Sequence, residues 1–227
     1  MNLLTKLKQT ITEKKLFLIS TLLGLTIISS FYTINTIAGS SRFIFTGINC
    51  LLMLTGSFFG ITAGTASIVL FFIIKSFWFS FPFTAGIPTL ASTTCFGAFH
   101  KNNTAVMRSL AIGVPLLCMI LFCIHPVGSL AMTYSTYWII PVICYALSYA
   151  APIFCAALAS TFVAHAIGSV MWLYLQPTTA AYWLNLIPVV AAERLIFASA
   201  ATLMYYGIVK SYNLLKTKNY HARLICK

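Results

Sequence analysis

The sequence predicts an all-α protein, a polytopic bundle of transmembrane helices without a soluble domain. Hydrophobic residues make up 60% of the chain and charged residues only 7%, whereas soluble domains average about 45–50% apolar and about 25% charged residues. Several apolar stretches approach or exceed the roughly 20 residues that a helix needs to cross a bilayer. These stretches do not alternate apolar and polar residues as membrane β-strands do, so we expect helices.

Seven apolar stretches are clear candidates for membrane spans. The first covers 16–38 and is longer than the apolar region of a signal peptide, which has about 7–15 residues, so we expect an uncleaved span. The other six are 44–62, 64–83, 104–124, 131–149, 152–175 and 181–208. A single transmembrane domain therefore covers 16–208, between a basic tail at 1–15 and another at 209–227.

Glycine and proline positions predict how these spans pack and bend. Gly56, Gly60 and Gly64 recur every four residues, which predicts one helix face for close backbone packing. Pro141 predicts a kink in its span, and residues 125–129 predict a turn.

Residues 84–100 form the one ambiguous segment. This stretch carries no Lys, Arg, Asp or Glu, yet it contains Pro88, two glycines and several hydroxyl side chains. Irregular backbone at membrane depth is tolerated only inside protein or beside a cavity. We therefore expect a short broken or re-entrant span, with a folded-over loop as the alternative.

Basic residues at the two ends predict the orientation of the chain. The formal net charge is +12, and positive residues that flank spans stay on the cytoplasmic side. Both termini should then be cytoplasmic, which requires eight crossings if 84–100 spans the membrane, or six if two segments fail to span. We expect a multi-pass protein of a bacterial inner membrane, in contact with the lipid bilayer. The basic clusters lack the interleaved aromatic residues of nucleic-acid sites, so nucleic acid is not an expected partner.

Sequence motifs favour neither an enzyme nor a metal or cofactor site. The seven cysteines include no C-x-x-C pair, and the four histidines no H-x-x-x-H pair. No serine lies in a G-x-S-x-G turn. A single glutamate within the apolar spans cannot supply the paired carboxylates of acid–base chemistry.

Glu193 is the most informative residue, because the sequence has only two acidic residues. It lies in the apolar run 186–205, and Arg194 follows it directly. A charge at the bilayer centre costs about 2.5–3.5 kcal/mol even on insertion scales, and such residues usually face the bundle interior. Successive residues point roughly 100° apart on a helix, so we expect at least one of these two side chains to reach another span.

The last two spans form a predicted hairpin centred near Thr179, which places His165 level with Glu193. At about 1.5 Å per residue, both residues lie roughly 20 Å from the turn, near the bilayer midplane. Residues three or four apart share a helix face, and this spacing gives the helix of His165 a polar stripe. Its members are Thr161, His165, Ser169, Trp172 and Gln176, and Asn185 adds a polar group on the last span.

Lys75 is a further charged residue within an apolar stretch. If 64–83 is a span, Lys75 lies near its middle, and the core then holds a net positive charge that suits an anionic solute. If the span begins earlier, Lys75 extends to an interface rich in aromatic residues. The sequence leaves both positions open.

Three stretches carry a family resemblance: 49–64, the Gly-Ile-Pro-Thr-Leu segment 86–90, and 164–174 running on to 187–193. They resemble the substrate-binding (S) component of energy-coupling factor (ECF) vitamin transporters, biotin type. The resemblance implies uptake of a vitamin-like solute. It also implies an ATPase and a coupling subunit as partners, since the chain has no phosphate-binding loop of its own. The family has fewer spans than we count here.

Together these features favour an integral membrane protein that binds and transports a small polar solute. Nine candidate residues for solute binding or proton coupling are Glu193, His165, Arg194, Lys75, Trp172, Asn185, Gln176, Ser169 and Thr161. A histidine beside a carboxylate can carry a proton. The alternative is a structural or assembly subunit of a membrane complex, in which the buried polar residues only fix helix packing. A membrane enzyme acting on lipid-linked substrates is a third option.

Overall fold

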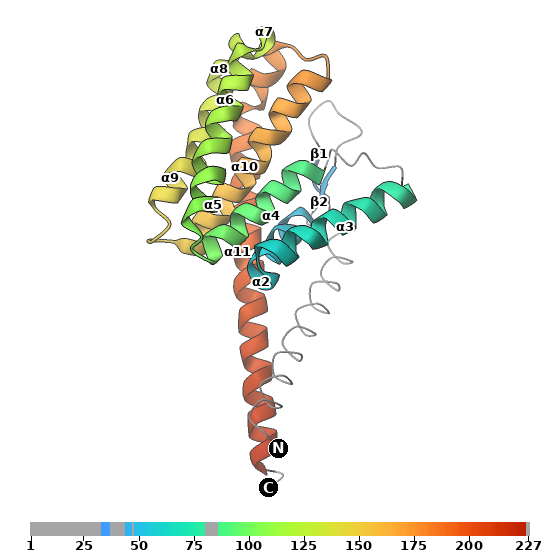
Figure 1. The fold of residues 1–227 in the computed structure, drawn as a ribbon, viewed down its shortest axis with the longest axis vertical. Coiled ribbons are helices and arrows are strands. Elements are labelled where there is room, and N and C mark those ends of the chain that lie inside the picture. Colours follow the sequence, from blue (N-terminus) through green and yellow to red (C-terminus); the bar gives the residue numbers. More distant parts are fainter. Residues whose placement is uncertain (1–32, 37–43, 47, 80–85, 226–227) are drawn as a thin grey trace. The chain divides into compact units, whose positions relative to one another are not determined.

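The computed structural model describes residues 33–36, 44–46, 48–79 and 86–225. The larger compact unit is Leu52–Thr202, and the described residues before and after it belong to a second unit. The described chain is helical (Figure 1), apart from two short strands. The predicted helical class is therefore confirmed.

The second unit contains the two strands, which the sequence analysis missed. β1 (Thr33–Thr36) pairs antiparallel with β2 (Ile44–Thr46), with Thr36 opposite Ile44. The sequence predicts these residues as parts of the first two helical spans, and that prediction is wrong here. Both strands consist mainly of β-branched residues, which favour extended backbone. Within the predicted span 16–38, only β1 is described, and the other residues of this span lie outside the described residues.

The second span prediction is wrong in length. Residues 44–62 contain α2 (Ile48–Phe59), and α3 (Ile61–Phe79) begins after Gly60. Gly60 has a φ of 90°, a left-handed conformation that glycine adopts at little cost, and it ends α2 there. The 12 residues of α2 cover about 18 Å, which is short of the roughly 30 Å of a bilayer core.

The predicted small-residue packing is confirmed at Gly56 and Gly64 but not at Gly60, which forms the turn. A Cβ at Gly56 would lie 2.1 Å from the carbonyl oxygen of Thr93, and one at Gly64 would lie 2.7 Å from the Gly56 Cα. Gly97 also packs closely on Gly56, since a Cβ at Gly97 would lie 2.7 Å from the Gly56 carbonyl oxygen. The Thr93 hydroxyl also donates to the carbonyl of Leu52, at 3.1 Å.

The segment 84–100 is neither broken nor a loop where it is described. It forms a regular helix, α4 (Ile87–His100), with Pro88 in the first turn. Proline is tolerated there because the first amide groups of a helix have no intrahelical partner. Most of α4 is buried, from Ser92 to Phe99, and it packs along α10 (Pro152–Leu175).

The predicted span 104–124 is confirmed as one continuous apolar helical segment. It consists of α5 (Thr104–Arg108), the π-helical turn η2 (Ser109–Gly113) and α6 (Val114–Ile124). Pro115 lies just after η2 and cannot donate a backbone hydrogen bond to residue 111, which explains the wider turn.

The predicted span 131–149 is wrong as a single α-helix. After α7 (Pro126–Ser129), the chain forms α8 (Met132–Ser135), the 3₁₀ turn η3 (Thr136–Ile139) and α9 (Ile140–Ala146). Pro141 does not kink a long helix but occupies the first turn of α9. The expected turn at 125–129 is present as α7, whose amide of Val127 donates to His125 Nδ1 at 3.2 Å.

The predicted final hairpin is confirmed. α10 ends at Leu175, residues 176–179 connect, and α11 begins at Ala180 and continues to Ile225. No helix break marks residue 208, so most of the expected tail 209–227 extends α11. Residues 209–225 include no proline and no glycine, which favours a helix.

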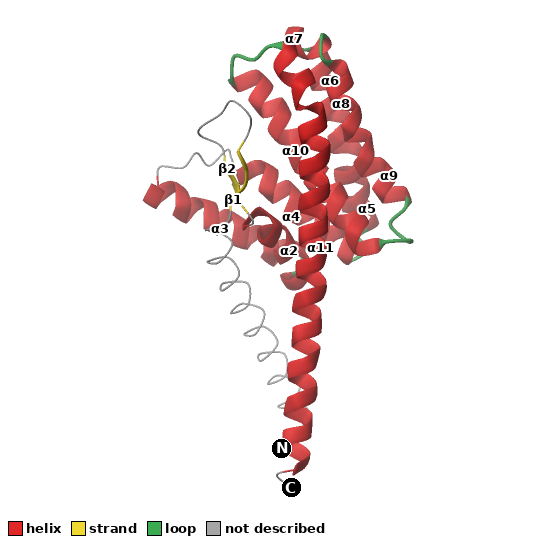
Figure 2. Ribbon diagram, turned by 180° about the vertical axis from the view of Figure 1, so that it is seen from behind, coloured by secondary structure: helices red, strands yellow, loops and turns green. Residues whose placement is uncertain are grey.

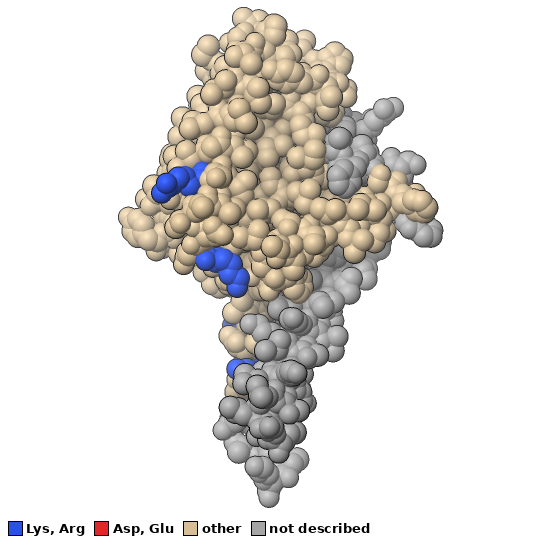
Figure 3. Space-filling model, viewed as in Figure 1, with Lys and Arg blue, Asp and Glu red and all other residues tan. Residues whose placement is uncertain are grey.

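Among the described residues, three helices are long and apolar enough to cross a membrane: Thr104–Ile124, Pro152–Leu175 and Ala180–Thr217. The described part of the chain does not show seven spans. Its surface carries little charge: in Figure 3 a few Lys and Arg side chains interrupt an otherwise uncharged described face, and no Asp or Glu is visible.

An aromatic core holds the larger unit together and positions the polar site. Figures 1 and 2 show α6, α10 and the start of α11 side by side, with α7 at the same end as the 176–179 connection. Their buried faces pack together with α8 and η3 in one core, whose large aromatic side chains are Phe122, Tyr134, Trp138 and Trp183. Phe122 contacts Trp138 and Trp183 edge to face, with ring centroids 5.3 Å apart in both pairs.

Candidate functional site

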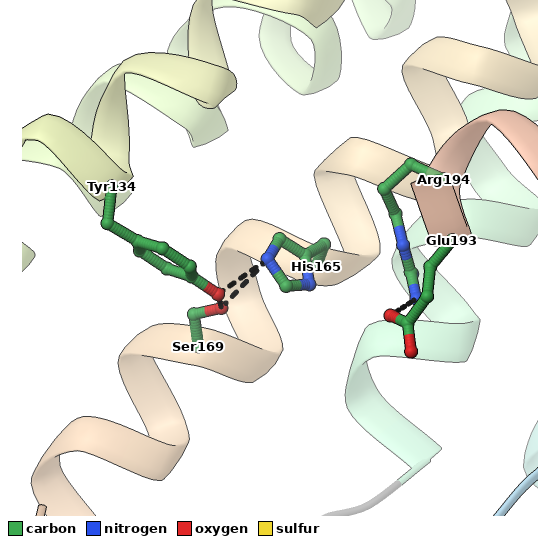
Figure 4. A network of polar contacts seen from close by, with 5 residues as sticks. All are labelled: Tyr134, His165, Ser169, Glu193 and Arg194. Carbon is green, nitrogen blue, oxygen red and sulfur yellow. Dashed lines mark hydrogen bonds and ion pairs between the residues drawn. The ribbon is translucent and has the colours of Figure 1, made fainter. Parts of the chain in front are cut away.

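Five polar side chains from three helices come together inside the larger unit (Figure 4). Tyr134 comes from α8, His165 and Ser169 lie one turn apart on α10, and Glu193 and Arg194 are neighbours on α11. We call these five residues the polar cluster. It lies among helices whose other buried side chains are mainly apolar.

His165 is the centre of a three-way hydrogen-bonded group. Its Nε2 lies 2.7 Å from the phenol oxygen of Tyr134 and 3.4 Å from Ser169 Oγ, and the two hydroxyl oxygens are 3.1 Å apart. Tyr134 and Ser169 are almost fully buried. Each hydroxyl can donate or accept, so the group can accommodate either tautomer of the imidazole.

Glu193 and Arg194 form a buried ion pair. Arg194 Nη2 donates to Glu193 Oε2 at 3.1 Å, and the residues are only 6% and 8% exposed, respectively. The Arg194 guanidinium carbon also lies 4.9 Å from the ring centroid of Phe197, in cation–π contact. The two flexible side chains overcome the roughly 100° between their starting directions. That one of them also reaches another span stays a prediction.

The ion pair and the histidine group are adjacent. In Figure 4, His165 lies between the two hydroxyls on one side and Glu193 and Arg194 on the other. Arg194 is close enough for its charge to act on the imidazole. The hairpin count thus located His165 and Glu193 in the same region, as equal distance from the turn at Thr179 predicted.

The remaining predicted site residues lie outside the cluster. The Thr161 hydroxyl is buried but donates to the carbonyl of Leu158 on its own helix, at 2.9 Å. Trp172 is half-buried against the aromatic core. Gln176 and Asn185 are exposed, because one ends α10 and the other faces outward on α11.

Lys75 lies one turn before the end of α3, which begins at Ile61 rather than at residue 64. Of the two positions that the sequence leaves open for Lys75, this earlier start of the helix corresponds to the one at the membrane interface. Its side chain lies outside the described part of the structure, so the expected positive core charge from Lys75 stays a prediction.

Tyr134 is the member of the cluster that sequence reasoning missed. It stands in an apolar, aromatic-rich segment, and nothing in its local pattern distinguishes it from Tyr137 or Trp138. Only its stacking on Phe122, with centroids 5.6 Å apart, and its contact with Trp183 direct the phenol oxygen toward α10.

The cluster supplies hydrogen-bonding groups and opposite charges. Within the described residues, no three His, Cys, Asp or Glu side chains are grouped as metal ligands. An imidazole bonded to two hydroxyls can take up or release a proton, and a carboxylate beside a guanidinium can bind groups of either charge.

Fold and site together define a class: a helical protein with apolar helices long enough to cross a membrane and a buried polar cluster between them. Comparison with family models, with curated proteins and with solved structures finds no match to this chain.

Proposed function

We propose that the protein is an integral membrane protein that binds and transports a small polar solute. The observation that carries this proposal is the polar cluster, an ion pair and a hydrogen-bonded histidine buried among apolar helices. Ionisable residues at membrane depth are expensive and usually mark a pathway or a binding site.

Stability alone is a weak explanation for such a cluster. A buried ion pair often contributes nothing more than well-packed apolar residues of the same volume. Hydrogen bonds between membrane helices average only about 0.6 kcal/mol. Binding a polar solute uses the same groups in a way that apolar residues cannot reproduce.

Each part of the cluster has a role in this proposal. Glu193 and Arg194 bind the charged or polar groups of the solute. His165, whose Nε2 lies 2.7 Å from Tyr134, carries a proton that couples transport to the proton gradient. Ser169 and Tyr134 hold the imidazole in place.

The competing function is that of a structural or assembly subunit. One observation favours it: the Glu193 carboxylate is already paired with Arg194 of its own helix, at 3.1 Å. In that case the cluster fixes the packing of α8, α10 and α11 and binds no solute.

A charge-neutral double variant separates the two functions. Glu193→Gln with Arg194→Gln removes both charges of the ion pair at once, and Ser199→Ala on the exposed side of α11 is the matched control. Uptake of radiolabelled small polar solutes is measured in cells expressing each form, and unfolding is followed in detergent. Lost uptake with retained stability supports transport, whereas unchanged uptake contradicts it. Lost stability favours the packing subunit.

The resemblance to ECF S components makes a narrower version of this proposal, in which a partner ATPase supplies the energy. Affinity purification of the chain from its own membranes in mild detergent tests it. An ATPase pair recovered with the chain supports the S-component assignment. Recovery of the chain alone, together with uptake that does not need ATP, argues for an independent transporter.

A further inference from the structure

We propose that α11 carries a binding site for one anionic phospholipid at the point where this helix leaves the membrane. The site is a recess of about 400 Å³ along one side of α11, lined by Tyr206, Val209, Lys210, Asn213, Leu214 and Thr217. We call it the α11 recess. It shares no residue with the polar cluster, so it does not depend on solute transport.

The polar residues of the α11 recess lie on one face of the helix. Tyr206, Lys210 and Asn213 follow one another at intervals of four and three residues, a spacing that places side chains one above another. All three are exposed, and their hydroxyl, ammonium and amide groups can each donate a hydrogen bond. The Thr217 hydroxyl instead donates to the carbonyl of Asn213, at 3.0 Å. The recess therefore offers three donors and one positive charge to a ligand.

The charge around the α11 recess favours an anion. After Arg194 the chain has no acidic residue, and its basic residues are Lys210, Lys216, Lys218, Arg223 and Lys227. Within the described residues, the Lys210 ammonium forms no salt bridge. A phosphate group accepts several hydrogen bonds and is attracted by this charge. A zwitterionic headgroup is less favoured, because its own ammonium is repelled.

The position of the α11 recess along the helix indicates that the phosphate belongs to a lipid. α11 rises about 45 Å between Ala180 and Lys210, at about 1.5 Å per residue. A bilayer with its headgroup regions is about 40–45 Å thick. A helix that enters at one surface near Ala180 therefore reaches the opposite headgroups near Lys210. Tyrosine is enriched at this level of a membrane, as at Tyr206.

An apolar surface continues from the α11 recess toward the membrane. Val209 and Leu214 flank the polar residues within the recess. Leu203 is 73% exposed and lies seven residues before Lys210, on the same face of the helix. A phospholipid can place its phosphate at Lys210 and an acyl chain along Leu203, whereas a free phosphate ion gains nothing from this apolar surface.

Native mass spectrometry of the purified full-length protein in detergent tests the proposal. The protein is stripped of copurified lipid and titrated separately with dioleoyl phosphatidylglycerol and dioleoyl phosphatidylcholine, which carry the same acyl chains. We expect the first phosphatidylglycerol to bind roughly fivefold more tightly than phosphatidylcholine, which corresponds to about 1 kcal/mol for one Lys beside an anionic lipid. Equimolar inorganic phosphate should not displace it.

Substitutions of two lysines on α11 separate a defined site from general attraction. Lys210→Gln keeps a good helix former and should remove the preference for phosphatidylglycerol, whereas Lys210→Arg keeps the charge and should retain it. Lys216→Gln is the matched control, because it removes the same charge from an exposed position outside the recess. The control should bind phosphatidylglycerol as the unchanged protein does.

Three outcomes would overturn the proposal. Equal weakening by Lys210→Gln and Lys216→Gln would mean that the basic end of the chain attracts anionic lipid without a defined site. Equal affinity of the unchanged protein for the two lipids would mean that the headgroup charge is not recognised. Displacement of phosphatidylglycerol by equimolar inorganic phosphate would mean that the recess binds free phosphate rather than a lipid.

Discussion

The Nε2 atom of His165 lies 2.7 Å from the phenol oxygen of Tyr134, a residue 31 positions earlier in the chain. This contact joins α8 to α10 across the aromatic core. The ring of Tyr134 is fixed between Phe122 and Trp183, with centroids 5.6 and 5.0 Å away. The imidazole therefore has a defined position from which to interact with the ion pair on α11.

Tyr134→Phe should lower solute uptake with a modest loss of stability. The substitution removes the hydroxyl that meets His165 and Ser169 and leaves the ring in place. Its expected cost is about 2 kcal/mol, since each of the two hydrogen bonds contributes about 1 kcal/mol, and the measurement is a shift in unfolding in detergent.

Tyr137→Phe is the matched control for this prediction. The Tyr137 hydroxyl donates to the carbonyl of Ile187 at 3.1 Å, away from the cluster. Both variants lose a tyrosine hydroxyl that is hydrogen-bonded, but only Tyr134→Phe should reduce uptake. Equal uptake in the two variants would remove Tyr134 from the functional site.

The ion pair should show strong coupling in a double-mutant cycle. Arg194→Gln or Glu193→Gln alone leaves one buried charge, at an expected cost of about 3–5 kcal/mol. The double variant should be close to the unchanged protein, because neither member of the pair is left buried without the other. Unfolding free energies measured for the four forms give the coupling, and strictly additive effects would contradict the pair.

Gly56→Ala should destabilise the packing of α2 against α4. The added methyl group would meet the carbonyl oxygen of Thr93 at 2.1 Å, and this backbone atom cannot move aside cheaply. Overpacking of this kind costs about 1–3 kcal/mol. The measurement is the thermal midpoint of the purified protein.

Gly113→Ala provides the contrast. Nothing lies within 4 Å of the position where its Cβ would be, and alanine is favoured over glycine in a helix by roughly 0.5–1 kcal/mol. This variant should be neutral or slightly more stable. A loss of stability equal to that of Gly56→Ala would mean that close packing is not the cause.

The two ends of the helical bundle should be accessible from opposite sides of the membrane. Lys101→Cys lies in the α4–α5 connection and Thr179→Cys in the α10–α11 connection, at opposite ends in Figure 1. In intact cells, a membrane-impermeant maleimide should label Thr179→Cys, but not Lys101→Cys or the native Cys226 near the C-terminus, which the basic residues predict to be cytoplasmic. For the two introduced cysteines, a background with Cys226→Ser removes the native signal. Labelling of Lys101→Cys from outside would contradict the predicted orientation.

The long apolar helices and the final hairpin were predictable because they depend on local properties. A run of about 20 apolar residues such as 104–124 has few structures open to it. The connection at 176–179 contains a proline between two such runs, which is a local turn signal. Counting from that turn was enough to bring His165 and Glu193 to the same region.

Predictions failed where a single backbone angle or a distant contact decided the outcome. The left-handed Gly60 divides α2 from α3, although its spacing from Gly56 and Gly64 indicated a packing face. The segment 131–149 divides into α8, η3 and α9, since Pro141 begins a helix rather than bending one. The strands β1 and β2 need each other as partners, and no single segment contains that information.

By itself, the sequence determined that this is an apolar helical protein with a glutamate, an arginine and a histidine buried near the end of the chain. The tertiary structure decided which of these groups meet. It paired Glu193 with Arg194 and joined His165 to Tyr134. The physical reason is that burial and helix length follow from hydrophobicity along the chain, whereas the rotation of each helix and the partner of each polar side chain depend on how the whole core packs.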